Sequence, residues 1–306
     1  MDTTYQLQWG RHYLMVEPNH FRVDYAINPY MNVRDQPEIV RVRQQWLGLI
    51  AQIHAAGADV EVLEQRPDAP DMVYAMNLGL VVNPSHPGMP ADAPLQTGRV
   101  VLSHMRYAER RMETGTAALW FEQAGFSRSW VGRDGVGAHF EAGDAFAFRD
   151  ALVVGCGPRT ELLGLKHLAI DLDVRVRGLR LTHPGMYHLD LAFCPLDENR
   201  AMVCPAAFDE ASARAALDLV PEPLVLTEEE ALTFCANSIV IGRTILMPAC
   251  PQRVRSQLEK WGFEIVLVEV GEFHKGGGSI RCLTNPLDVR LGRDLPEVLG
   301  GEVLLP

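Results

Sequence analysis

The sequence predicts an α/β fold in which a ββαβ unit is repeated about five times and the repeats close into a ring. Three observations predict it: paired apolar stretches that flank turn residues, Asn or Asp at a regular interval before them, and helical segments between them. Closed repeats of this length commonly fold as one body, so residues 1–306 are expected to form a single domain.

The paired apolar stretches are typical of β-hairpins. They span residues 144–156 (DAFAFRDALVVGC), 190–205 (DLAFCPLDENRAMVCP) and 237–248 (NSIVIGRTILMP), each with turn residues in its middle. A longer copy covers residues 77–105, where an insertion rich in Pro and Gly, residues 83–98, separates the two apolar stretches.

A polar residue opens each repeat at a near-constant interval. The six positions are Asn28, Asn77, Asp144, Asp190, Asn237 and Cys282. The last three intervals are 46, 47 and 45 residues, and six positions for five units predict that the first and last segments share one unit. Equivalent positions of a closed ring cluster at one end of its axis. A thiol among carboxylates and amides is costly for packing alone, so this cluster indicates a site.

Helical segments lie between the hairpins. Apolar residues recur at three- and four-residue spacing over residues 38–56, 210–219 and 252–261, which predicts amphipathic helices. A strand-like run, EIVLVEV at 264–270, follows the last of them. A Rossmann-type fold also alternates strands and helices, but it lacks a hairpin at each period and usually carries G-x-G-x-x-G, which is absent from this sequence.

The composition disfavours several classes of partner. With 28 basic and 39 acidic residues the net charge is −11, which repels nucleic acids and anionic membrane surfaces. There is neither a signal-peptide pattern nor an apolar run long enough to span a membrane. Six cysteines without a C-x-x-C pair predict free thiols in the cytoplasm. A small-molecule ligand is expected, and a homo-oligomer is compatible with the sequence.

Cys282 is the expected nucleophile. It follows three glycines in HKGGGSIRCLTNP, which allow the backbone to turn tightly and to approach a ligand. We expect the thiol on a short strand, SIRCL, with Lys275 and Arg281 lowering its pKa. The other five cysteines lie in apolar strands or beside prolines and are expected to be structural.

His188 is the expected proton carrier. It precedes Asp190 by two residues, so alternation along a strand would put both side chains on one face. An imidazole beside a thiol nucleophile can protonate a leaving amine, and Glu141 is a carboxylate that could orient the ring and raise its pKa. A buried structural histidine is the alternative. The short His-x-acid pairs do not predict a metal site, and we expect no metal or cofactor.

Six segments, in order, resemble the guanidine-modifying enzymes of the pentein (amidinotransferase/deiminase) superfamily. They are HFRVDYAINPYM, PDMVYAMNLGLV, VVLSHMRYAERRMET, FEAGDAFAF, YHLDLAF and GGGSIRCLT. The superfamily includes dimethylarginine dimethylaminohydrolases, arginine deiminases, arginine dihydrolases and arginine:glycine amidinotransferases. The resemblance runs from about residue 15 to residue 290 and implies a five-bladed α/β propeller with pseudo-fivefold symmetry.

The resemblance also implies roles for individual residues. Cys282 matches the nucleophile that attacks the guanidinium carbon and forms a covalent intermediate. His188 matches the group that protonates the leaving amine and then activates water, and Glu141 matches the carboxylate that supports it. Asp190 matches the carboxylate that binds the guanidinium nitrogens, and Arg110 matches an arginine that holds the substrate carboxylate. Positions that line the substrate are matched by Asn28, Asp71 and Asn77. Acids and amides suit a planar cation, and an arginine suits a carboxylate.

Departures from the family pattern concern the substrate. Asn77 is often Asp in deiminases and dimethylaminohydrolases, whereas arginine dihydrolases resemble this sequence in having Asn. The bulkier Met76 and Leu78 flank it, and Tyr107-Ala108 replaces a usual His-Pro pair.

Several functions follow from the resemblance. Arginine dihydrolysis to ornithine, ammonia and carbon dioxide is favoured by Asn77, and dimethylarginine dimethylaminohydrolase chemistry, which gives citrulline, is the second hypothesis. An amidinotransferase would use the same thiol but would need an acceptor amine. A catalytically inactive binding protein is disfavoured, because related inactive proteins lack the Cys/His pair.

Overall fold

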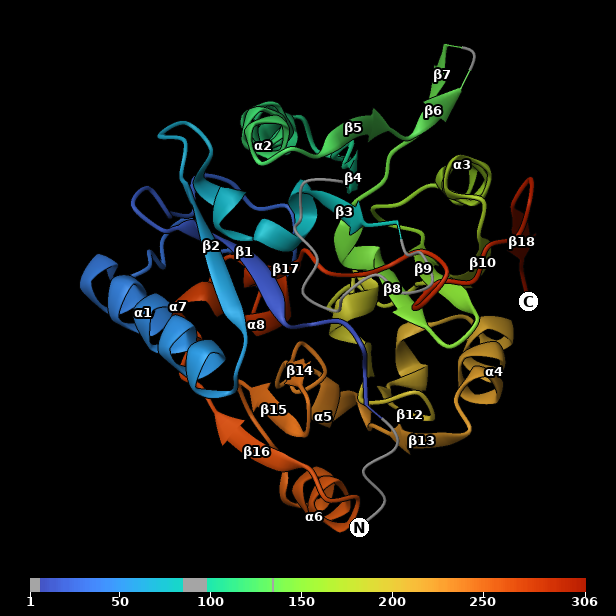
Figure 1. Ribbon diagram of the computed structural model, residues 1–306. Coiled ribbons are helices and arrows are strands. Elements are labelled where there is room, and N and C mark those ends of the chain that lie inside the picture. Colours follow the sequence, from blue (N-terminus) through green and yellow to red (C-terminus); the bar gives the residue numbers. More distant parts are fainter. Residues whose placement is uncertain (1–5, 85–97, 134) are drawn as a thin grey trace.

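The computed structural model describes residues 6–84, 98–133 and 135–306. Their strands form five sheets of three or four strands and one two-stranded hairpin. In Figure 1 the five sheets follow one another around the middle of the molecule, and the longer helices lie on the outer side. The fold is mixed α/β, as the sequence predicts.

One arrangement recurs in four sheets. Two antiparallel strands are followed by a helix and by a third strand that pairs parallel with the second. The sets are β3 (Gly79–Val82), β4 (Arg99–Leu102), α2 (Arg111–Gln123), β5 (Ser127–Trp130); β8 (Ala145–Phe148), β9 (Ala151–Cys156), α3 (Leu162–Leu172), β10 (Arg175–Arg180); β11 (Phe193–Pro195), β12 (Arg200–Val203), α4 (Glu210–Leu219), β13 (Glu222–Val225); and β14 (Ile239–Ile241), β15 (Thr244–Met247), α6 (Gln252–Lys260), β16 (Glu264–Leu267). These pairings confirm the predicted hairpins. Residues 85–97 of the predicted insertion lie outside the described part of the chain.

The fifth sheet joins segments that are far apart in the sequence. Strand β1 (His12–Glu17) pairs antiparallel with β17 (Asn285–Pro286). Helix α1 (Ile39–Ala55) then leads to β2 (Asp59–Glu64), which pairs parallel with β1. The prediction that the first and last segments share one unit is therefore confirmed.

The remaining elements are short. Strand β18 (Glu302–Leu304) extends the sheet of β10, and β6 (Gly132–Arg133) pairs with β7 (Val136–Gly137) in the separate hairpin. Two four-residue helices, α5 (Glu228–Ala231) and α7 (Gly271–His274), precede β14 and β17 in the chain.

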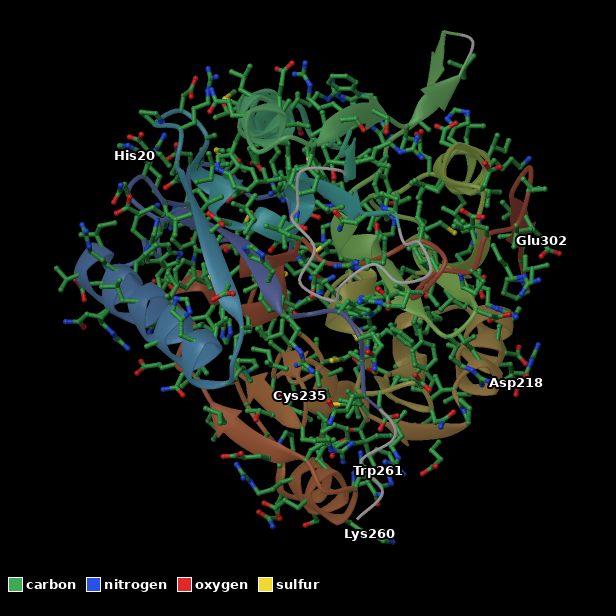
Figure 2. The ribbon with its side chains drawn as sticks, viewed as in Figure 1. His20, Asp218, Cys235, Lys260, Trp261 and Glu302 are labelled. Carbon is green, nitrogen blue, oxygen red and sulfur yellow. The ribbon has the colours of Figure 1, made fainter. Side chains whose placement is uncertain are left out.

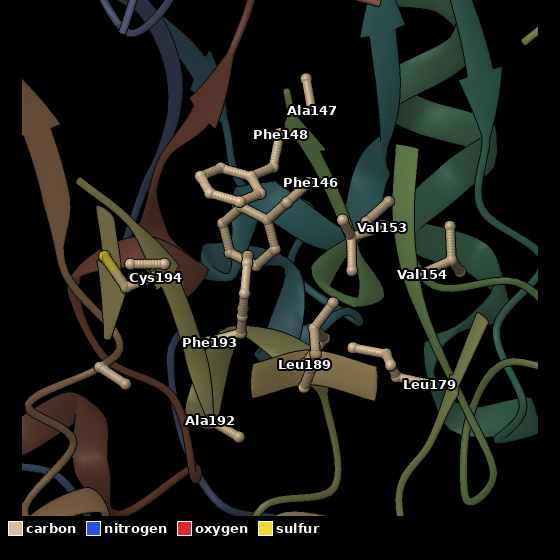
Figure 3. Packing of buried hydrophobic residues seen from close by; sticks show 14 of the residues in the cluster. Phe146, Ala147, Phe148, Val153, Val154, Leu179, Leu189, Ala192, Phe193 and Cys194 are labelled. Carbon is tan, nitrogen blue, oxygen red and sulfur yellow. The ribbon is translucent and has the colours of Figure 1, made fainter. Parts of the chain in front are cut away.

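The hydrophobic core lies between the sheets. Every residue of β8 and β9 is buried, as expected of continuous apolar strands covered on both faces. Phe146 and Phe148 pack edge-on against Phe193 of the next sheet, with ring centroids 5.8 and 5.6 Å apart (Figure 3). By contrast, charged side chains such as Asp218 and Lys260 lie at the outer edge (Figure 2).

Several of the polar residues that open the repeats lie on short helices rather than on strands. Asn77 lies on η2 (Ala75–Leu78), Asp144 on η5 (Ala142–Asp144) and Asp190 on η6 (Leu189–Leu191), which are 3₁₀ helices directly before a first strand. The prediction that His188 and Asp190 share a strand face is therefore wrong, because His188 is the N-terminal cap of η6.

The expected strand SIRCL is also absent. Residues Ile280–Leu283 form the single-turn helix α8, and the strand begins only at Asn285. The Thr284 hydroxyl donates hydrogen bonds to the carbonyls of Ile280 and Arg281. These bonds close the turn locally, and the apolar alternation of SIRCL does not reveal them.

Candidate active site

Cys282 lies between an amide and a carboxylate. Its Sγ donates to Oδ2 of Asp190 at 3.4 Å and accepts from Nδ2 of Asn237 at 3.2 Å. Asn237 also accepts from the backbone N–H of Cys282 at 3.2 Å and donates to the backbone carbonyl of Asp190 at 3.0 Å. Asn237 therefore fixes the thiol against the carboxylate, and all three side chains are buried.

The free thiol is held in its neutral form. Burial raises the pKa of Cys282 well above its ordinary value, and the negative charge of Asp190 raises it further. Lys275 is occupied by Glu272 at 2.9 Å and by Asp35 at 3.3 Å. The prediction that nearby cations give Cys282 a lowered pKa is wrong for the free protein, because burial outweighs them.

His188 and Glu141 form a buried pair. Nε2 of His188 lies 2.8 Å from Oε2 of Glu141, and the backbone N–H of Arg106 donates to the other oxygen at 2.9 Å. Although burial would raise it, the Arg159 guanidinium and the bond to His188 hold the pKa of Glu141 well below its usual range. An ionised Glu141 can therefore orient the imidazole and stabilise its protonated form.

The other imidazole nitrogen faces the substrate-binding candidates. A Cβ atom on Gly143 would lie 3.3 Å from Nδ1 of His188, 3.2 Å from Oδ2 of Asp190 and 2.9 Å from Oδ1 of Asn77. The three polar side chains therefore border one small space, which glycine at position 143 keeps open. Asn77 is oriented there by a hydrogen bond, because its Oδ1 accepts from the Gly143 N–H at 2.9 Å.

Asp71 and Arg110 are two further buried residues that were expected to bind the substrate. Oδ1 of Asp71 is buried and has no hydrogen-bond partner among the described residues. Burial raises the pKa of Asp71 to about 6, although the Arg110 charge and the Tyr25 hydroxyl act to lower it. Arg110 donates from Nη2 to the Asp71 backbone carbonyl at 3.2 Å. Its Nε and Nη2 each donate to a carboxylate oxygen of Glu113 at 2.8 Å.

Asn28 holds the glycine run in place. Its Nδ2 donates to the carbonyl of Gly276 at 3.0 Å, and its Oδ1 accepts from the backbone N–H of Tyr30 at 3.0 Å. A Cβ on Gly277 would lie 2.5 Å from the Asn28 amide, and one on Gly278 would lie 2.3 Å from the ring of Tyr74. The glycines are thus required for close packing beside Cys282.

Asp144 has a different role from the other repeat-opening residues. Its Oδ1 accepts from the backbone N–H of Leu189 at 2.9 Å, and its Oδ2 accepts from the hydroxyl of Thr160 at 2.6 Å. These bonds order the segment that follows His188. Asp144 therefore supports the site indirectly. Both of its carboxylate oxygens accept hydrogen bonds from neighbouring residues of the protein.

Arg159 is a residue of the site that the sequence did not predict. Its guanidinium carbon lies 4.7 Å from the ring centroid of Tyr107 and 4.6 Å from that of Tyr187. Nη1 donates to Glu141 at 3.0 Å, and Nη2 donates to the carbonyl of Ile27 at 3.1 Å. The available signal was an arginine three residues after the end of the fully apolar strand β9.

The site contains acids, amides and a thiol, with no cluster suited to a metal. Across residues 6–84, 98–133 and 135–306, no group of three or more His, Cys, Asp or Glu could hold a metal ion. In the same residues no helix has the length and apolar character needed to cross a membrane.

Comparison with known proteins places this site in a family. The sequence model described as "N,N dimethylarginine dimethylhydrolase, eukaryotic" matches residues 17–289. The chain belongs to this family. Membership of the pentein superfamily, expected from the six sequence segments, is thereby confirmed.

Family relatives include two kinds of hydrolase. The chain is 34% identical over 278 residues to the bifunctional arginine dihydrolase/ornithine cyclodeaminase ArgZ of Synechocystis sp., covering 89% of this chain and 37% of ArgZ. It is 30% identical over 274 residues to the N(G),N(G)-dimethylarginine dimethylaminohydrolase of Mycobacterium tuberculosis, covering 90% and 85% of the two chains. The chain thus spans little more than a third of the bifunctional relative.

Solved structures of relatives have the same fold. The N-terminal domain of ArgZ, bound to product, superposes with a TM-score of 0.82 at 32% identity and covers 93% of this chain and 99% of that domain. A dimethylarginine dimethylaminohydrolase from Pseudomonas aeruginosa gives a TM-score of 0.72 at 18% identity, covering 90% and 98%. The latter likeness concerns the fold alone.

Proposed function

We propose that this protein is a cysteine-dependent hydrolase that acts on the guanidinium carbon of arginine, as an arginine dihydrolase. The observation that carries the proposal is the buried thiol of Cys282, bonded at 3.4 Å to Oδ2 of Asp190. That oxygen and the His188 imidazole, whose other nitrogen is fixed by Glu141, border the same space at Gly143. The similarity to nearly the whole N-terminal domain of ArgZ supports this substrate.

Binding of the guanidinium cation would begin the reaction. Oδ1 of Asp190 and Oδ1 of Asp71 are buried without partners among the described residues, and both can accept N–H bonds from the cation. Arg110 would hold the substrate carboxylate through Nη1, because its Nε and Nη2 bind Glu113. Asn28 would line the site through the loop that it fixes. The arriving positive charge opposes the effects of burial and of Asp190, so the thiol can transfer its proton to His188, which later delivers it to the leaving nitrogen.

Covalent catalysis would then proceed in two steps. The Cys282 thiolate forms a bond to the guanidinium carbon, and the C–N bond breaks as His188 delivers a proton to the leaving nitrogen, which departs as ammonia. The neutral imidazole next takes a proton from water, whose oxygen attacks the same carbon and displaces the thiolate. The product of this first round is a neutral ureido compound.

Asn77 would favour a second round. Because its Oδ1 accepts from the Gly143 N–H, its Nδ2 donor is the part of the amide left for a ligand. A guanidinium carries only donors, whereas a ureido group carries a carbonyl oxygen that can accept from Nδ2. Asn77 should therefore retain the neutral intermediate long enough for a second attack, which releases ornithine, ammonia and carbon dioxide.

Dimethylarginine dimethylaminohydrolase activity is the second candidate. It is favoured by the matching family model and by the relative from Mycobacterium tuberculosis. The same thiol would release a methylated amine and stop at citrulline.

The test is product analysis by mass spectrometry after incubation with arginine and with methylated arginines, with and without an acceptor amine. We expect ornithine from arginine alone, and a shift towards citrulline in Asn77→Asp, since a carboxylate favours the cation over the ureido group. Cys282→Ser is the inactive control. Citrulline as the sole product, or turnover of methylated arginines only, would refute the dihydrolase.

We also infer that the five sheets are the blades of a propeller with pseudo-fivefold symmetry, in a single domain of residues 1–306. The repeated pairing of strands supports this inference. A cytoplasmic location is supported by six cysteines that are all unpaired.

A further inference from the structure

We infer that Tyr187 is a positioning residue that connects the glycine run beside Cys282 to the segment that carries His188. The inference rests on the proposed function and deepens it, because it concerns how the nucleophile and the proton carrier of that reaction are held relative to each other. Tyr187 directly precedes His188 in the chain, and its hydroxyl and its ring contact different parts of the site.

The hydroxyl of Tyr187 holds the glycine run. It donates to the carbonyl of Gly277 at 2.6 Å, and burial raises the pKa of Tyr187 well above its ordinary value, so the phenol keeps this proton. Gly277 has a φ of +88°, a conformation that favours glycine. A Cβ on Gly278 would lie 3.0 Å from Cβ of Cys282. The hydroxyl therefore fixes a backbone turn that packs directly on the nucleophilic residue.

The aromatic ring of Tyr187 packs on the imidazole side of the site. Its centroid lies 4.6 Å from the guanidinium carbon of Arg159 and 5.0 Å from the ring centroid of His188. Arg159 and His188 both bond to Oε2 of Glu141, at 3.0 and 2.8 Å. The ring therefore contacts both of the side chains that share this carboxylate oxygen, and it restricts where each of them can lie.

Tyr187 adds a second connection between the nucleophile segment and the imidazole segment. Asn237 makes the first, because it accepts from the backbone N–H of Cys282 and donates to the backbone carbonyl of Asp190. Tyr187 bonds to the chain five residues earlier, at Gly277. One connection would let a segment rotate about it, whereas two fix both distance and orientation. A displacement of about 1 Å at a reacting group can slow an enzyme by about 100-fold, so this orientation affects the rate.

The first test compares Tyr187→Phe with Tyr74→Phe. Tyr74 is the matched control, because it is also buried and its hydroxyl also donates to a backbone carbonyl, that of Phe273 at 2.7 Å. That bond does not involve the segment of His188. With arginine as substrate, we expect Tyr187→Phe to lower kcat about tenfold with KM within about twofold of wild type. Tyr74→Phe should keep kcat within about twofold, although a role in stability alone would affect the two variants alike.

A second substitution tests the ring. Tyr187→Phe keeps the contact with Arg159 and loses only the bond to Gly277, whereas Tyr187→Leu loses both. We expect kcat of Tyr187→Leu to be at least about threefold below that of Tyr187→Phe, because the stacked ring no longer restrains the guanidinium that bonds to Glu141. Equal kcat values in the two variants would overturn the part of the inference that concerns the ring.

Hydrogen exchange followed by mass spectrometry gives a readout that needs no turnover. In Tyr187→Phe the amides of residues 276–283 and of residues 188–192 should both exchange at least about threefold faster than in wild type, whereas Tyr74→Phe should leave residues 188–192 unchanged. Unchanged exchange in either segment of Tyr187→Phe, or an unchanged kcat, would overturn the inference. A wild-type protein that does not convert arginine would refute the proposed function instead, and the exchange rates would still decide whether Tyr187 connects the two segments.

Discussion

Two sides of the site differ in how completely their polar groups are bonded. On the imidazole side, Glu141 accepts from His188, from Arg159 and from the backbone of Arg106. On the thiol side, Asp190 has one oxygen bonded to Cys282 and one without a partner among the described residues. The carboxylate of Glu141 is therefore fully hydrogen-bonded in the free protein. One oxygen of Asp190 is left to receive a bond from a cation.

The difference shows how a buried site can be both stable and ready to bind. A satisfied network in a low-dielectric interior is rigid and holds its geometry. An unpartnered buried carboxylate destabilises the free protein, and a guanidinium that pairs with it removes that penalty on binding.

The largest effect is expected from the thiol itself. Cys282→Ser should reduce turnover by at least ~100-fold, because a serine hydroxyl stays protonated near neutral pH. Cys194→Ser and Cys250→Ser are the controls and should change stability more than chemistry. A Cys282→Ser protein that keeps more than a few per cent of wild-type turnover, measured by ammonia release, would end the covalent mechanism.

Removal of the imidazole should come next. His188→Ala should slow turnover by roughly 10²–10⁴-fold, since one imidazole handles both proton transfers. Breakdown of the covalent intermediate should be slowed at least as much as its formation, so rapid-quench mass spectrometry should show the adduct accumulating. A near-normal rate would assign the proton transfers to another group, such as His183.

The ion pair between Arg159 and Glu141 on the imidazole side can also be removed by substitution. Arg159→Met leaves Glu141 as a buried charge without its guanidinium partner, which should lower the free energy of unfolding by about 3–5 kcal/mol. Arg106→Met is the matched control, because its ion pair with Glu161 is exposed and should contribute less than about 1 kcal/mol. Urea denaturation measures both. Equal losses in the two variants would mean that burial of the Glu141 pair is unimportant.

The sequence predicted the hairpins of the fold better than the side-chain arrangement of the site. Hairpins such as residues 144–156 were recoverable, because apolar runs around turn residues are local signals. The single turn at Ile280–Leu283 was not, because it is closed by hydrogen bonds from the Thr284 hydroxyl. Arg159 was missed for a related reason: its ring contacts and its bond to Glu141 join distant segments.

Electrostatics was the other part that the sequence could not supply. Lys275 and Arg281 are close to Cys282 in the chain, which favoured a lowered thiol pKa. Burial instead raises the pKa of the thiol, and burial depends on the whole packed structure. Likewise, Arg110 was expected to be available to a ligand, yet two of its nitrogens bond to Glu113.

Asp71, the other buried carboxylate with an oxygen that has no partner among the described residues, offers the mildest test. Burial raises its pKa to about 6, so it becomes a carboxylate only as pH rises through that value. Attraction for a guanidinium should follow, and KM for arginine should rise by up to about tenfold for each pH unit below 6. In Asp71→Asn this slope should disappear while the thiol chemistry remains. A wild-type KM that stays flat from pH 5 to pH 7 would show that Asp71 does not contribute its charge to binding.

As pH rises, the free energy of unfolding of the free protein should fall while its affinity for arginine increases. A carboxyl group whose folded pKa is raised contributes stability that is fully present below its unfolded pKa, near 3.9, and is lost as pH rises through about 6. For Asp71 the loss amounts to at most about 3 kcal/mol, and Asp71→Asn should remove it from the urea-denaturation profile between pH 4 and pH 7. Glu141, whose pKa is lowered, should show the reverse slope at acid pH. The free energy of unfolding should therefore depend on pH with opposite slopes for Glu141, whose charge is paired, and for Asp71, whose buried charge lacks a paired cation.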